Sequence, residues 1–297
     1  MTSKAKEPSA NAKNGFSLIS DEKLLALYAR MLKCRMLEER VRDLVKSNQF
    51  AGNGCDTLGQ EAVAVGAAID LLPEDTACSA QGDLIVKFVQ DDAPDKIFRD
   101  LFAGAGSPDE VRLATDAALV NKLEKNGKIA VVFSGDRLPL PESWHEALNF
   151  ACIENLPVLF VCQSGMRTEP ANLTPQAGAE ELAPKAHARG FPAIAVDGND
   201  VVAVYRVASE AMAHARIGHG PTLMECRTWR LSSHPEAVPG PEDVERWESE
   251  DPILNMEKYL SGKGLFSEGF KRQAALGFSK ELDAVLDAAQ SSPCIGG

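Results

Sequence analysis

The sequence predicts an α/β protein built on a mostly parallel sheet. Short apolar runs that suit buried strands alternate with segments of about ten to fifteen residues in which apolar side chains recur at helical spacing. Parallel strands need helical crossovers of this kind, so the alternation indicates βαβ units. The apolar run 129–133 is also followed by Gly135-Asp136. In an open α/β sheet, a Gly-Asp at the carboxyl end of a strand lies where phosphates and their metal ions bind.

The chain before residue 128 is predicted to be mainly helical. Residues 1–17 are polar and lack periodicity, which is typical of a disordered leader. Ser20, with two acidic residues directly after it, has the features of a capped helix start. Pro73 stops a helix whose side chains are mostly small. The expected elements are helices at 20–48, 58–72, 84–103 and 108–125 and a short strand at 76–80.

From residue 128 onwards, strands and helices alternate regularly. Apolar runs at 129–133 and 157–162 enclose a helix at 142–154, and residues 163–165 are interpreted as the turn after the second run. The sequence has no internal repeat and no convincing linker, so residues 18–297 are predicted to form one domain with a helical extension from about 240. The other expected elements are strands at 193–196 and 222–226 and helices at 179–189, 201–216, 241–248, 252–262 and 266–290.

Composition restricts the class of protein. Of the 297 residues, 44% are hydrophobic and 25% are charged, which is ordinary for a soluble globular protein. A net charge of −12 without a basic cluster argues against nucleic-acid binding. No apolar run is long enough to cross a membrane, and residues 1–8 lack the apolar core of a signal peptide, so a cytoplasmic location is expected. Seven cysteines without a Cys-x-x-Cys pair argue against a zinc site or a disulfide framework.

Five segments, taken in order, resemble the α subunits of thiamine diphosphate-dependent 2-oxo acid dehydrogenase E1 components. They are the helix 24–41, Gly59-Gln60-Glu61-Ala62 and the helix after it, the Gly-Asp turn at 135–136, the segment 197–201, and the segment 220–231. The resemblance covers about residues 21–253. It implies the thiamine diphosphate-binding fold, with a mostly parallel central sheet flanked by helices, and thiamine diphosphate and Mg as cofactors. The implied reaction is oxidative decarboxylation of a 2-oxo acid such as pyruvate.

The same resemblance assigns the cofactor site. Gly135, Asp136, Arg137 and Gly165 occupy the positions of cofactor-binding residues, and Asp136 together with a backbone carbonyl near Arg167 is what remains of the metal site. The family has Gly-Asp-Gly where this chain has Gly135-Asp136-Arg137, so a side chain intrudes where bare backbone approaches the diphosphate. Gly165 stands where the family has a metal-ligating Asn and offers no side-chain oxygen. These departures from the family's pattern therefore predict that cofactor binding is weak or absent.

Other candidate residues have two interpretations each. His234 aligns with a family loop at the mouth of the active site, where a His positions cofactor and acyl acceptor, and it is the catalytic candidate. The alternative is an exposed loop histidine without a function. Asp136 could instead cap the next helix or pair with Arg137. From the resemblance, Gln60 and Glu61 should serve helix packing and the subunit interface rather than chemistry.

Three functional hypotheses follow. The first is an α-type subunit that pairs with an E1 β-type chain or with itself, because the family holds its cofactor between an α and a β chain. The alternative is a non-catalytic pseudoenzyme that serves as a scaffold or regulator of an E1-type chain. A third hypothesis is that Arg137 and Arg167 bind a different anion in the same crevice. A titration with thiamine diphosphate and Mg²⁺ separates the first two.

Overall fold

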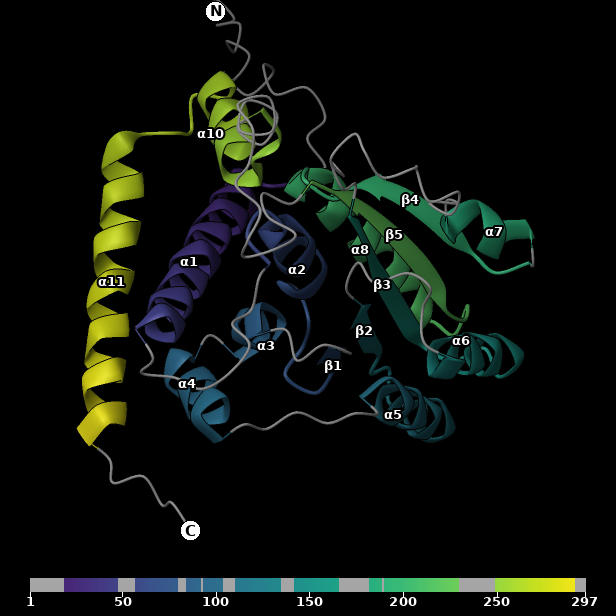
Figure 1. Ribbon diagram of the computed structural model, residues 1–297. Helices are drawn as coiled ribbons and strands as arrows, with labels where there is room; N and C mark the ends of the chain where they lie inside the picture. Colours follow the sequence, from purple (N-terminus) through teal and green to yellow (C-terminus); the bar gives the residue numbers. More distant parts are fainter. Residues whose placement is uncertain are drawn as a thin grey trace, which may run out of the picture.

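The computed structural model confirms the α/β class. It describes residues 19–47, 57–79, 84–91, 93–103, 110–134, 142–165, 182–188, 190–229 and 249–291. Five parallel strands form one sheet in the order β1-β2-β3-β5-β4 (Figure 1). The predicted leader 1–17 and the predicted helix 241–248 lie outside the described residues. The strands are β1 (Thr76–Ser79), β2 (Ala130–Ser134), β3 (Val158–Gly165), β4 (Ala193–Asp197) and β5 (Thr222–Thr228).

Helices cover both faces of the sheet because the strand order reverses once. The connections from β1 to β4 all advance in the same direction across the sheet, whereas the connection from β4 to β5 steps back. Crossovers between parallel strands are right-handed, so the reversal places a helix on the opposite face. Accordingly α5 (Glu110–Glu124), α6 (Glu142–Ile153) and α7 (Leu182–Ala188) cover one face, and α8 (Val201–Arg216) covers the other.

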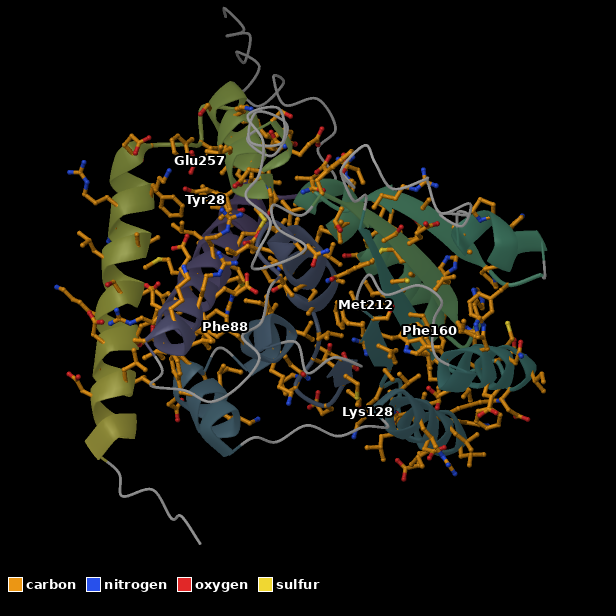
Figure 2. The ribbon with its side chains drawn as sticks, in the orientation of Figure 1. Tyr28, Phe88, Lys128, Phe160, Met212 and Glu257 are labelled. Atoms are coloured by element: carbon orange, nitrogen blue, oxygen red, sulfur yellow. The ribbon has the colours of Figure 1, made fainter. Side chains whose placement is uncertain are left out.

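Two apolar cores result from the alternation of side chains along each strand. The smaller core lies under α5 and α6 and contains Phe160, whose ring meets that of Trp144 edge to face at 5.5 Å. The larger core lies between the other face and the terminal helices and contains Tyr28, Phe88 and Met212 (Figure 2). Successive residues of β2 and β3 point alternately into the two cores, as the pleat requires.

The terminal helices form a layer on the larger core. Helix α1 (Asp21–Lys46) begins at Ser20, whose hydroxyl accepts a hydrogen bond from the backbone N–H of Lys23 at 3.2 Å. Helix α11 (Glu268–Ser291) lies beside α1, and α10 (Pro252–Gly262) contacts the same helix (Figure 1). Within the part of the chain that the structure describes, no helix is long and apolar enough to span a bilayer.

Helix α2 (Glu61–Ala68) is enclosed within the chain. Every one of its residues is buried, and it packs against α8. Gly66 permits this approach, because a Cβ atom there would lie 2.7 Å from Cγ1 of Val204. The small side chains that the sequence shows in this helix therefore serve close packing. The helix is shorter than the predicted 58–72.

Two other boundaries differ from the prediction for identifiable reasons. The predicted helix 84–103 is two helices, α3 (Leu84–Asp91) and α4 (Pro94–Ala103), because a proline suits a first turn and not a helix interior. Residues 163–165, interpreted as a turn, instead extend β3 and pair with 226–228 of β5. The ladder with β5 offers their backbone groups partners that a turn would lack.

Candidate functional site

The candidate site lies at the carboxyl edge of the sheet. In the register of β3 and β5, Gly165 is paired with Thr228, and each is the last residue of its strand. The chain leaves β3 toward α7 on one face and leaves β5 toward α10 on the other. The crevice between such strands is the topological switch point, where open α/β sheets bind their ligands.

Only one of the predicted site residues is described by the structure. Gly165 ends β3 at the switch point, and its part in cofactor binding remains a prediction. The others lie outside the described residues, and their roles remain predictions. These are Gly135, Asp136, Arg137, Arg167 and His234.

The described part of this edge holds no set of metal-ligating side chains. Mg²⁺ needs oxygen ligands in octahedral geometry, and Gly165 has no side chain to supply one. Among the described residues, no group of three or more His, Cys, Asp or Glu side chains is placed to hold a metal. The hydroxyl of Ser134, at the end of β2, is buried and has no hydrogen-bond partner within the described ranges. It could donate to an anion at this edge.

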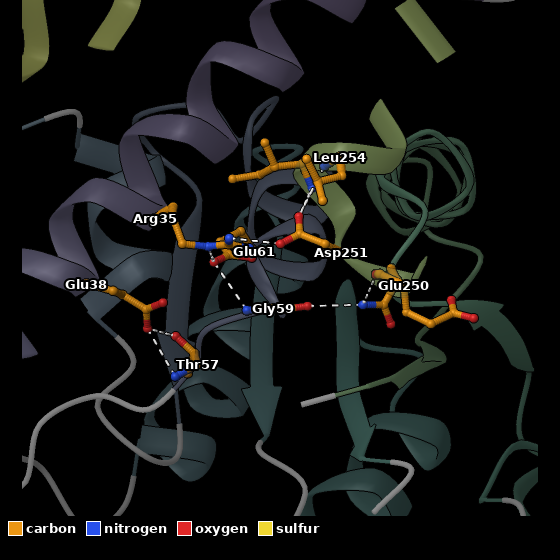
Figure 3. A network of polar contacts seen from close by, with 10 residues as sticks. Arg35, Glu38, Thr57, Gly59, Glu61, Glu250, Asp251 and Leu254 are labelled. Carbon is orange, nitrogen blue, oxygen red and sulfur yellow. Dashed lines mark hydrogen bonds and ion pairs between the residues drawn. The ribbon is translucent and has the colours of Figure 1, made fainter. Parts of the chain in front are cut away.

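Beside the switch point, a buried ion cluster joins three helices (Figure 3). The Arg35 guanidinium of α1 donates to both carboxylate oxygens of Glu61, with 3.0 Å between Nη2 and Oε2, and to Oδ2 of Asp251 at 3.0 Å. The Glu61 and Asp251 side chains are 0% and 3% exposed. Asp251 also caps α10, accepting from the backbone N–H of Ile253 at 2.8 Å and of Leu254 at 3.1 Å.

The arginine in this cluster stays charged. Burial by itself lowers the pKa of Arg35, but the hydrogen bonds and charges of Glu61 and Asp251 together raise that pKa above its ordinary value. The cluster carries two carboxylates and one guanidinium, and the amino terminus of α10 partly offsets the second negative charge. Such a cluster holds the start of α2 and the start of α10 against α1.

Two buried amides connect the cluster to the end of β5. The Asn199 amide donates to the carbonyl oxygens of Gly59 at 3.2 Å and Glu250 at 2.9 Å, and its oxygen accepts from the N–H of Trp229 at 2.9 Å. Gln60 donates through Nε2 to the Thr228 hydroxyl at 2.8 Å. In Figure 3 the backbone N–H of Gly59 donates to Oε1 of Glu61 at 3.3 Å. The Gly59 carbonyl accepts from the Asn199 amide, which also donates to the Glu250 carbonyl.

The structure gives Gln60 and Glu61 the helix-packing role that the resemblance implied, since both are buried among α1, α2 and β5. Their part in a subunit interface remains a prediction. The sequence interpretation missed Arg35, and it matched the segment containing Asn199 without giving that residue a role. A charged residue among the apolar positions of α1 was the available signal for Arg35.

Comparisons with known proteins agree with this architecture. The family model described as dehydrogenase E1 component matches residues 103–295. A 3-methyl-2-oxobutanoate dehydrogenase subunit alpha from Mycobacterium tuberculosis is 33% identical over 296 residues, covering 91% of this chain and 80% of the relative. A pyruvate dehydrogenase E1 component subunit alpha from Staphylococcus aureus is 30% identical over 298 residues, covering 92% and 80%.

A parallel sheet with a ligand edge at its switch point defines a large class of α/β nucleotide- and cofactor-binding proteins. Within that class, this chain belongs to the dehydrogenase E1 component family. Its relatives are α subunits, so it is an α-type E1 component of the thiamine diphosphate-dependent 2-oxo acid dehydrogenases.

Proposed function

We propose that this chain pairs with a β-type chain to form a 2-oxo acid dehydrogenase E1 component, and that its own grip on magnesium-bound thiamine diphosphate is impaired. The relatives named above are subunits of a pyruvate and a 3-methyl-2-oxobutanoate dehydrogenase, which supports a 2-oxo acid as the substrate class. When bound, thiamine diphosphate supplies the ylid that attacks the oxo group, and the protein supplies orientation and proton transfer.

The proposed impairment rests on the position and the chemistry of Gly165. It ends β3 in register with Thr228, at the switch point, without a side-chain oxygen. The sequence adds Arg137 in place of the close-approach glycine and Ala80-Gln81-Gly82-Asp83 in place of the family's diphosphate-contacting Tyr-Arg-Asp-His. Each charged hydrogen bond contributes about 1.5–3 kcal/mol, so losing several together lowers affinity by orders of magnitude.

Titration of this chain with thiamine diphosphate and Mg²⁺, both alone and in complex with a co-expressed β-type chain, tests this proposal. We expect no measurable heat by calorimetry and a melting shift below about 1 °C at low millimolar ligand, because only binding to the native state stabilises it. A shift of several degrees under these conditions would contradict the impairment.

A restored variant sharpens the same test. Combining Gly165→Asn with Arg137→Gly supplies an amide oxygen and removes the intruding side chain, so we expect affinity for the magnesium-bound cofactor to rise at least about tenfold. The matched control combines Gly165→Ala with Arg137→Gly, which adds a side chain without an oxygen. Equal affinity of the two variants would show that position 165 takes no part in metal binding.

The pseudoenzyme alternative differs in one outcome. Co-expression with a β-type chain of the same host, followed by purification and an assay of 2-oxo acid decarboxylation, separates the two. A stable complex with decarboxylase activity supports the catalytic subunit, whereas a stable complex without activity supports a scaffold or regulator. Absence of any complex with a β-type chain would contradict both.

A further inference from the structure

Two buried amides at the candidate ligand edge have no place in the proposed chemistry. Gln60 and Asn199 are 2% and 3% exposed, and each makes one hydrogen bond to the segment Thr228–Trp229 at the end of β5. Buried amides carry a desolvation cost unless they are fully bonded. Because both amides lie next to the switch point, we consider which parts of the chain their hydrogen bonds hold in place.

Asn199 anchors the chain on both sides of the segment between β5 and α10. Its oxygen accepts from Trp229, directly after β5, and its nitrogen donates to Glu250, directly before the α10 cap. The same nitrogen donates to Gly59, at the start of the α2 turn. One side chain therefore fixes the position at which the chain leaves β5 and the position at which α10 begins.

Gln60 acts on the residue next to Gly165. Its Nε2 donates to Thr228, which is fully buried and is the register partner of Gly165. On the β4 side, Thr228 packs closely on Gly198: a Cβ atom there would lie 2.5 Å from the Thr228 methyl group, so only glycine permits this approach. The last residue of β5 is thus held from two sides, and the end of β3 pairs with it.

We propose that Gln60 and Asn199 are positioning residues of the ligand edge, which fix the Thr228–Trp229 strand end and through it the end of β3 at Gly165. This inference rests on the proposed function only for the identity of the ligand, which would be thiamine diphosphate or a related diphosphate. The positioning itself is a property of the ligand-free chain and is tested there.

The test is hydrogen exchange of the ligand-free full chain, wild type against Asn199→Asp. The substitution keeps an acceptor for Trp229 but turns oxygen toward the carbonyls of Gly59 and Glu250. We expect protection to fall about tenfold at 227–229 and at 163–165, relative to the centre of β5 at 223–225, because one lost hydrogen bond corresponds to roughly a tenfold change. A loss of protection spread evenly over the sheet would overturn the proposal.

The pH dependence of this variant is a second readout. Burial and two facing carbonyl oxygens disfavour the ionised form, so the pKa of the introduced carboxyl lies above its unfolded value of about 3.9. The variant's stability is therefore retained below about pH 4 and is lost as pH rises through the folded pKa. Exchange at 227–229, corrected for intrinsic rates, should approach wild type at low pH; an unchanged ratio between pH 4 and 7 would contradict the role of the amide donor. The charged residues of the elements that meet here are Arg35, Glu61, Asp197, Asp200, Arg227, Glu250 and Asp251.

Two more variants keep the proposal testable if Asn199→Asp does not fold. Thr228→Val removes only the hydroxyl that Gln60 binds and should produce the same local loss at 163–165 to a smaller extent. Asp75→Asn is the matched control, because Asp75 is a buried carboxylate that binds Arg216 and the N–H of Ile129 at the opposite, amino end of the strands. It should lower stability without a selective loss at the carboxyl edge. Cofactor titration of the same proteins then tests the proposed function separately.

Discussion

Gly198 illustrates how closely single residues are packed around the end of β5. Its backbone N–H donates to the carbonyl of Arg227 at 2.7 Å, and a Cβ atom would meet that carbonyl oxygen at 2.9 Å and the Thr228 methyl group at 2.5 Å. Real Cβ contacts do not approach so closely, and the strand end is already held by Gln60. The glycine is required here by the close approach of two backbones.

We therefore expect Gly198→Ala to lower the free energy of unfolding by about 1–3 kcal/mol, because overpacking forces backbone shifts. Urea denaturation followed by circular dichroism measures the change. Gly277→Ala is the matched control, since a Cβ atom there meets nothing within 4 Å and lies in the interior of α11. That control should be neutral or stabilising by up to about 1 kcal/mol. Equal destabilisation by the two substitutions would contradict the steric argument.

At the scale of elements, α11 is held on the molecule by aromatic contacts. Phe278 is 2% exposed, and its ring lies 5.4 Å from that of Phe88 in α3. The Lys33 ammonium of α1 lies 5.2 Å from the Phe278 ring centre. Near the start of α11, Lys271 pairs with Glu257 of α10, which also accepts a hydrogen bond from buried Tyr28 at 2.8 Å. The carboxyl-terminal helix is thus part of the larger core.

Phe278→Ala should lower the free energy of unfolding by about 3–5 kcal/mol, because it removes a buried ring and leaves a cavity between three helices. Thermal and urea unfolding measure the loss. Leu276→Ala, two residues earlier on the same helix but 57% exposed, should change stability by no more than about 0.5 kcal/mol. A small effect of Phe278→Ala would mean that α11 contributes little to the folded state.

For the whole molecule, we propose that residues 18–297 unfold as one domain. The sheet contributes side chains to both cores, so neither core can be lost while the other stays intact. Trp144 is fully buried in the smaller core, and α11 belongs to the larger one. The chain has three tryptophans, so the fluorescence is measured in a variant that keeps only Trp144. Its fluorescence and far-ultraviolet circular dichroism should therefore report the same urea midpoint. Separate transitions would indicate that the carboxyl-terminal extension unfolds independently.

Local sequence signals predicted most elements. The Ser20 cap with helical periodicity predicted α1, and the apolar runs predicted the central strands, because these signals act over a few residues. The same signals placed the end of β3 too early. Gln163, Ser164 and Gly165 have no strand preference of their own, and they join the ladder because β5 lies beside them. Their state depends on a strand that comes about sixty residues later in the chain.

The sequence alone determined the α/β class, most of the elements and the E1 resemblance, because periodicity, caps and ordered motifs are properties of neighbouring residues. Only the tertiary structure decided which distant groups meet. Arg35 reaches Glu61 across 26 positions and Asp251 across 216, and Gln60 reaches Thr228 across 168. Burial of charges and amides is tolerable only when their partners arrive from other elements, and those partners depend on how the helices pack on the sheet.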